Sequence, residues 1–112
     1  NGRKLFSEVA YKVATEWNKN GNCAVVAGAT SPEELGSVRK IVGDMPILIP
    51  GVGKQGGDVL KVLEYGRDSR RRGMIINNSS GIIFASSGPD FAQKAREATL
   101  KLHTQIIESG LV

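Results

Sequence analysis

Short apolar runs alternate along this chain with longer segments of helical periodicity, and this alternation restricts the fold more than any other feature. The apolar runs are rich in Val, Ile and Ala, and the run at residues 23–29 suits a strand buried on both faces of a parallel sheet. They lie at residues 23–29, 45–51 and 73–85, the last of them breaking at the polar stretch NNSSG. Helices are predicted at residues 3–18, 31–43, 58–66 and 89–110.

This order predicts an α/β fold in which one helix is followed by three β-α units. Strands that alternate with helices are typical of parallel strands joined by right-handed crossovers. The spacing of the strand starts is close to the repeat of a (β/α)₈ barrel, which has about 250 residues in eight units. No linker or low-complexity segment interrupts the chain, so residues 1–112 are expected to form a single α/β unit, a partial (β/α)₈ TIM barrel.

Several helix ends and buried faces are also predicted. Ser31 is a natural N-cap, Pro32 fits the first helical position, and Glu34 completes a capping box. Three aspartates, Asp44, Asp58 and Asp90, lie at helix ends and are expected to act as caps. The residues expected to face inward are Leu35, Val38, Ile41 and Val42; Val59, Leu60, Val62 and Leu63; and Phe91, Ala95, Ala98, Leu102 and Ile106.

Composition and charge exclude several classes of protein. The net charge is +4, and much of the excess lies in Arg67 and the run 70–72. Stacking aromatics are absent nearby, so this run indicates a solvated loop rather than a nucleic-acid site. The single cysteine, Cys23, is expected to be a small buried apolar residue in a reducing compartment. No signal peptide and no apolar segment of about 20 residues is visible, so a soluble cytoplasmic protein without membrane contact is expected.

Ligands of parallel α/β folds bind at the carboxyl ends of the strands, and the loop after the second predicted strand is the strongest candidate there. It has the sequence PGVGKQGGD, from Pro50 to Asp58. Its glycines let the backbone approach an anion, and Gln55 adds an amide donor. The alternative is that these glycines only satisfy turn geometry, because the loop matches neither a Walker loop nor a dinucleotide fingerprint.

The loop after the third predicted strand, NNSSG at 77–81, is expected beside the glycine loop. A phosphate shared between the loops after the last two strands is frequent in (β/α)₈ barrels. In the alternative, Asn77, Asn78, Ser79 and Ser80 only cap the strand and the turn. The two loops together favour a phosphate site.

Motifs for other chemistry are missing from the sequence. It contains no CxxC, HExxH or GxSxG pattern, and His103 has no partner at metal-ligand spacing, so no metal site and no serine-hydrolase site are expected. His103 is expected at the surface. Trp17 lies on a helical stripe and is expected in the core or at an interface.

Two segments together resemble a known family. VVAGATSPEELGSVRKIVGDMPILIPGVGKQGGD and IINNSSGIIFAS are similar to the C-terminal part of orotidine 5′-phosphate decarboxylases of the longer bacterial subgroup. The family pattern runs GAT-x-PEEL, then L-x-PG-[IV]-GAQGGD, then a strand ending NSSRGI-[IL]-YA. The resemblance covers roughly residues 1 to 108.

The resemblance implies the last three strands and four helices of a (β/α)₈ barrel, and decarboxylation of orotidine monophosphate to uridine monophosphate without a cofactor. By the family's motif, Gln55 and the amides of Gly56 and Gly57 contact the substrate phosphate. Pro50 and Gly51 line the mouth of the active site. Gly81 belongs to the second phosphate loop.

The chain departs from the family pattern at two positions. Ser80 stands where the family has the arginine of NSSRGI, a bidentate phosphate ligand whose charge a serine cannot replace. Lys54 stands where the family has the alanine of GAQGG. Lys54 either returns a positive charge to the phosphate region or points to solvent beside an altered site. Ser80 and Lys54 are therefore both retained as candidate phosphate-site residues.

The catalytic residues of the family follow the pattern D-x-K-x-x-D, which does not occur in these 112 residues. The chain is therefore expected to carry substrate-phosphate loops but no catalytic residues, and to be inactive alone. Three functions stay open: the C-terminal portion of a decarboxylase, a non-catalytic phosphate- or nucleotide-binding module, and a structural half-barrel. Part of a barrel exposes sheet edges and an apolar inner face, which predicts a homo-oligomer or association with an N-terminal barrel half.

Overall fold

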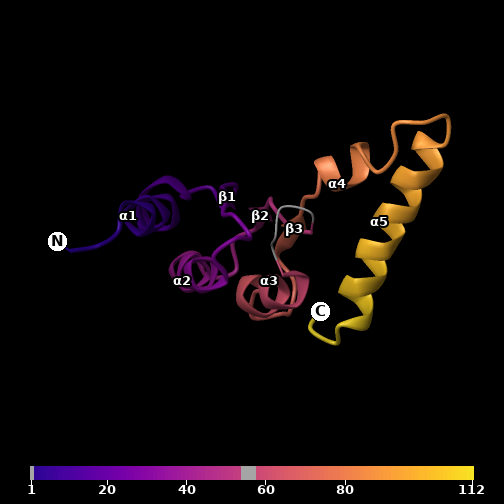
Figure 1. Ribbon diagram of the computed structural model, residues 1–112. Coiled ribbons are helices and arrows are strands. Elements are labelled where there is room, and N and C mark those ends of the chain that lie inside the picture. Colours follow the sequence, from indigo (N-terminus) through magenta and orange to yellow (C-terminus); the bar gives the residue numbers. More distant parts are fainter. Residues whose placement is uncertain (1, 54–57) are drawn as a thin grey trace.

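A three-stranded parallel sheet, in the order β1-β2-β3, forms the centre of the computed structural model, which describes residues 2–53 and 58–112. The α/β order predicted from the sequence is confirmed (Figure 1). The elements are α1 (Leu5–Lys12), the π-helical turn η1 (Val13–Trp17), β1 (Val25–Val26), α2 (Pro32–Val42), β2 (Ile47–Ile49), α3 (Val59–Gly66), β3 (Met74–Ile76), α4 (Ser80–Ile83) and α5 (Phe91–Glu108).

The strands are shorter than the apolar runs that predicted them, but the pairing continues beyond their ends. Val25 and Val26 of β1 pair with Ile47 and Leu48 of β2. The N–H of Ala27 then donates to the carbonyl of Leu48 at 3.0 Å, and the N–H of Ala29 to that of Pro50 at 2.9 Å. The ladder therefore runs to the first residue of the glycine loop.

In the part of the chain that the structure describes, helices cover one face of the sheet and leave the other open. Ile47 and Ile49 of β2 are fully buried on the covered side, where α2 and α3 lie next to each other (Figure 1). Successive residues of a strand point to opposite faces, and Val26, Leu48 and Ile75 form one row across the three strands on the other face. Val26 is 70% exposed and Ile75 55% exposed. The expectation that residues 23–29 form a strand buried on both faces was therefore wrong, and the uncovered inner face was predicted correctly.

The molecule is elongated because α5 and α4 extend away from the sheet (Figure 1). The radius of gyration is 15.6 Å and the extents are 53 × 27 × 27 Å, whereas a compact domain of this length has a radius of gyration of about 13 Å. None of the residues of α5 is fully buried, and Phe91 is 61% exposed, contrary to its predicted inward position. Leu102 is the residue of α5 that packs against the core.

The predicted helix ends are only partly correct. Ser31 is the N-cap residue of α2 and Pro32 is its first residue, but the side chain of Ser31 makes no capping hydrogen bond. The capping box is absent because the carboxylate of Glu34 accepts a hydrogen bond from Lys4 Nζ at 2.8 Å instead. Asp58 caps α3 as predicted, accepting from the N–H of Lys61 at 3.2 Å.

Four other predictions about single residues need correction. Asp90 makes no capping hydrogen bond to α5, and Asp44 binds Ser69 in the turn before β3 rather than a helix end. Leu60 is 54% exposed because it lies on the solvent face of α3. Cys23 is only half-buried, and its Sγ lies 3.6 Å from the carbonyl oxygen of Trp17.

A buried arginine that was not predicted from the sequence joins the amino-terminal ends of the strands. Arg39 lies on α2 and is 8% exposed. Its guanidinium donates four hydrogen bonds to backbone carbonyls, which belong to Gly66 at 2.7 Å, Gly43 at 2.7 Å, Met45 at 2.6 Å and Gly73 at 2.9 Å. Burial lowers the pKa of Arg39 from its ordinary value, and the charges of Asp68 and Asp44 oppose that shift.

Asp68 organises the arginine-rich turn between α3 and β3. Its buried carboxylate accepts from the N–H of Arg70 at 2.8 Å and from the N–H of Arg72 at 2.9 Å. The N–H of Arg72, with smaller contributions from the N–H and guanidinium of Arg70, holds the pKa of Asp68 below its ordinary value. Gly73 packs against this carboxylate at φ 80°, where a Cβ would lie 2.7 Å from Asp68 Oδ2.

Stability is expected to decline in acid through Asp68. Its pKa in the folded chain is lower than the unfolded value of about 3.9, so the stabilisation is present above that value and is lost as the pH falls through the folded pKa. We expect the Asp68→Asn variant to show a shallower decline of the unfolding free energy below about pH 4. Urea unfolding followed by circular dichroism at a series of pH values measures this slope.

Asp44→Asn is the comparison variant for this experiment. The hydroxyl of Ser69, and to a smaller extent its N–H, lowers the pKa of Asp44. The unfolding free energy of this variant should therefore also decline less steeply in acid than that of the parent. An Asp68→Asn chain with the parent's slope would contradict the role assigned to Asp68.

Candidate functional site

The loops that follow β1, β2 and β3 lie side by side at the carboxyl edge of the sheet. The N–H of Ala29 donates to the carbonyl of Pro50, and the N–H of Asn77 donates to the carbonyl of Ile49 at 3.1 Å. These hydrogen bonds hold the start of the glycine loop between the two other loops. The neighbouring position expected for the glycine loop and the NNSSG loop is therefore present.

A polar hollow of about 180 Å³ lies between the loops after β2 and β3. Its lining residues are Pro50, Gly51, Val52, Asn77, Asn78 and Ser79. Val52 is 1% exposed and anchors its loop to the core. Gly51 and Gly53, on either side of it, have φ values of 85° and 86°, a conformation that glycine adopts without strain.

The amide of Asn78 lies between the two loops. Its Oδ1 accepts a hydrogen bond from the N–H of Gly81 at 3.1 Å. A Cβ added at Gly53 would lie 3.1 Å from Asn78 Nδ2, so the other end of the amide is next to the loop after β2. Asn77 Nδ2 donates to Ser79 Oγ at 3.2 Å.

The described lining of the hollow contains hydrogen-bond donors but no charged side chain. An anion in it would be held by amide and hydroxyl donors, which make weaker hydrogen bonds than a guanidinium. In the part of the chain that the structure describes, no group of three His, Cys, Asp or Glu side chains could hold a metal ion. His103 is exposed, as predicted.

The predicted site residues fall into two groups. Pro50 and Gly51 line the hollow, and Ser80 and Gly81 are the first two residues of α4, directly after Ser79. The other predicted residues, Lys54, Gln55, Gly56 and Gly57, lie outside the described residues. Asn77, Asn78 and Ser79 belong to the NNSSG loop that was expected to hold phosphate but were not named as site residues, and Val52 was missed. The two asparagines and Ser79 could have been assigned to the site from the sequence, because they directly follow a predicted strand.

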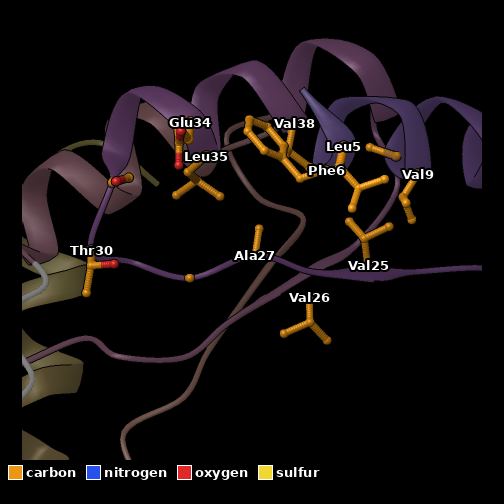
Figure 2. A pocket seen from close by; sticks show the side chains of 13 residues that line it. Leu5, Phe6, Val9, Val25, Val26, Ala27, Thr30, Glu34, Leu35 and Val38 are labelled. Carbon is orange, nitrogen blue, oxygen red and sulfur yellow. The ribbon is translucent and has the colours of Figure 1, made fainter. Parts of the chain in front are cut away.

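A larger apolar hollow of about 660 Å³ lies along the free edge of β1, between α1 and α2 (Figure 2). Leu5, Phe6 and Val9 of α1 face Val25 there, while Val26 points to the other side of the strand. Leu35 and Val38 of α2 close the hollow from above in this view. Because its lining is mostly apolar, this hollow is better suited to packing against apolar side chains than to catalysis.

No helix in the described ranges 2–53 and 58–112 is long and apolar enough to cross a membrane. These observations define the class of protein. The chain is part of a parallel α/β barrel and has a polar hollow at the carboxyl ends of its strands.

Comparison with known proteins identifies the family within this class. The chain is 50% identical over 99 residues to the orotidine 5′-phosphate decarboxylase of Aromatoleum aromaticum, covering 88% of this chain and 36% of that protein. It is 49% identical over 106 residues to the corresponding enzyme of a Janthinobacterium species, covering 95% of this chain and 39% of the relative. No family model matches the chain.

The fold agrees with the sequence comparison. The structure of orotidine monophosphate decarboxylase from Leishmania donovani matches with a TM-score of 0.74 at 30% identity, covering 96% of this chain and 40% of that one. The chain thus belongs to the orotidine 5′-phosphate decarboxylase family and corresponds to the C-terminal part of its (β/α)₈ barrel. It spans less than two fifths of the length of these two curated relatives.

Proposed function

We propose that this chain is the substrate-phosphate-binding part of an orotidine monophosphate decarboxylase, which converts orotidine monophosphate to uridine monophosphate in pyrimidine biosynthesis. One observation carries the proposal. A chain 50% identical to such an enzyme has a polar hollow between the two loops that carry the family's phosphate motifs.

Each candidate residue has a role in this proposal. Gln55 and the amides of Gly56 and Gly57 bind phosphate oxygens, and Gly81 belongs to the second phosphate loop. Pro50 and Gly51 line the mouth of the active site. The hydroxyl of Ser80 and the ammonium of Lys54 are the groups at the two positions that depart from the family pattern.

The carboxylate and lysine groups that carry out the decarboxylation must come from outside these 112 residues, because the sequence has no D-x-K-x-x-D pattern. The open face with its row Val26, Leu48 and Ile75, together with the apolar hollow beside β1, supports association with an N-terminal barrel half or with a second copy of the chain. Unpaired strand edges and uncovered apolar faces favour such association. We place the resulting assembly in the cytoplasm.

Reconstitution tests this proposal. We expect no orotidylate turnover from the chain alone, and turnover after it is refolded with the N-terminal part of the Aromatoleum aromaticum relative. The loss of orotidylate absorbance measures the reaction, and size-exclusion chromatography with light scattering measures assembly. Val26→Asp is the matched control: Val26 is 70% exposed, so the substitution should spare the fold while placing a charge on the open face and preventing assembly.

A stable, well-folded monomer that does not combine with the N-terminal part would contradict the association. A complex that forms but shows no turnover of orotidylate would contradict the proposed decarboxylase function.

A second function, a non-catalytic nucleotide- or phosphate-binding module, is favoured by the uncharged described lining of the hollow and by Ser80. Calorimetric titration of the chain with uridine monophosphate separates it from a purely structural half-barrel. Binding without turnover in the reconstituted complex would support the module, and no binding at millimolar ligand would support the structural role.

A further inference from the structure

Asn78 connects the two loops of the hollow through one side chain. Its Oδ1 accepts from the N–H of Gly81, in its own loop, and its Nδ2 lies against Gly53, in the loop after β2. The two glycines leave the space that this amide occupies. A Cβ at Gly81 would lie 2.5 Å from Asn78 Oδ1, and one at Gly53 would lie 3.1 Å from Nδ2. The side chain is therefore seated between two positions that lack side chains.

The hydrogen bond to Gly81 determines which end of the amide is which. A backbone N–H can only donate, so the atom that faces it must be the carbonyl oxygen of the side chain. The NH₂ group then lies on the Gly53 side. Asn78 lines the hollow, and within residues 2–53 and 58–112 the hydrogen bond of its side chain is the one accepted by Oδ1. With respect to these described residues, the NH₂ group of Asn78 is a donor without an acceptor at the hollow.

The lining around this donor suits an anion. None of its described residues carries a carboxylate that would repel one. In the family pattern NSSRGI, the position of Asn78 is a serine, whose hydroxyl is too short to reach both loops, and the position of Ser80 is an arginine. This loop therefore lacks the charged guanidinium of the family pattern but has an additional neutral donor, the side-chain amide of Asn78.

From this geometry we propose that Asn78 binds a phosphate oxygen of a phosphate monoester through Nδ2 while Oδ1 holds the turn at Gly81. The inference rests on the proposed phosphate site and adds to it a ligand residue that the family's motif does not contain. Because a neutral hydrogen bond contributes about 0.5–1.5 kcal/mol, loss of this donor should weaken binding roughly threefold to tenfold.

Titration of the chain with inorganic phosphate and with uridine monophosphate, followed by NMR, tests the inference. Asn78→Asp keeps an oxygen for Gly81 but replaces the NH₂ group with a negatively charged oxygen. We expect this variant to lose more than tenfold in affinity for both ligands while its Tm and the amide resonance of Gly81 stay close to those of the parent. Asn78→Ser should bind roughly threefold to tenfold more weakly than the parent.

Gln105→Glu, the same amide-to-acid change on an exposed position of α5, is the control for net charge and should bind like the parent. If Asn78→Asp binds both ligands as tightly as the parent does, Asn78 has only a structural role and this inference fails, while the proposed phosphate site stands. A parent chain that binds neither ligand at millimolar concentration overturns both.

Discussion

Replacing Arg39 with methionine is expected to lower the free energy of unfolding by roughly 3–5 kcal/mol. Methionine has a similar length and fills the same space, but it cannot donate a hydrogen bond. The carbonyls of Gly43, Met45, Gly66 and Gly73 would then lose the donor that they share. A buried polar group without a partner costs about 1–3 kcal/mol, and partial entry of water keeps the total below the sum of four.

The position of these carbonyls explains why one side chain has such an effect. Gly43 directly follows α2 and Gly66 ends α3, while Met45 and Gly73 precede β2 and β3. The positive charge of Arg39 also lies at two helix carboxyl ends, where the helix dipole favours a cation. Because total stabilities are typically about 5–15 kcal/mol, this loss is a large fraction of the stability of a typical domain.

Urea unfolding followed by circular dichroism measures this effect. Lys40→Met is the matched control on the next residue of α2, which is exposed, and it should change the stability by no more than about 0.5 kcal/mol. Arg39→Lys keeps the charge, but its ammonium cannot reach all four carbonyls at once. Its free energy of unfolding should therefore lie between those of Arg39→Met and Lys40→Met. An Arg39→Met chain within about 1 kcal/mol of the parent would show that the four carbonyls find other partners.

Arg39 also shows where prediction from the sequence stops. The pattern of Leu35, Val38 and Val42 identified the buried face of α2 correctly. It gave no reason to bury a cation on that face, because charged residues are almost never fully buried unless paired. The acceptors that make this burial possible are turn carbonyls as far as 34 positions away, and sequence periodicity carries no information about them.

The same limit applies to the exposed face of the sheet. A run such as CAVVAGA is equally apolar whether one face or both faces are covered, so the exposure of Val26 could be inferred only from the number of strands. At the site, the position after a strand was enough to find both loops. The position of the Asn78 side chain between the two loops was not predictable, because it depends on the absence of a side chain at Gly53, 25 positions away.

Replacing Ser80 with arginine is expected to tighten binding of uridine monophosphate roughly tenfold to a hundredfold. Ser80 is the first residue of α4, next to the lining residue Ser79, and the family pattern has arginine at this position. A hydrogen bond that involves a charged group contributes about 1.5–3 kcal/mol, and a guanidinium can bind two phosphate oxygens at once. Because the family pattern has the longer arginine at this position, we expect the loop to keep its shape in this variant.

Calorimetric titration measures the gain, and uridine, which lacks the phosphate, is the control ligand. Affinity for uridine should not change, and the gain for the monophosphate should shrink with added salt, since exposed charges are screened. An unchanged affinity for the monophosphate, or an equal gain for uridine, would contradict a phosphate site at this loop.

The same titration separates the two roles left open for Lys54. If its ammonium replaces the missing arginine, Lys54→Ala should weaken binding in the parent and have a smaller effect in the Ser80→Arg chain, because the guanidinium then supplies the charge. Such non-additivity is expected of two groups that act on one ligand. If Lys54 only points to solvent, its removal should leave the affinity unchanged in both chains, and in the parent the phosphate would depend on neutral donors such as Asn78.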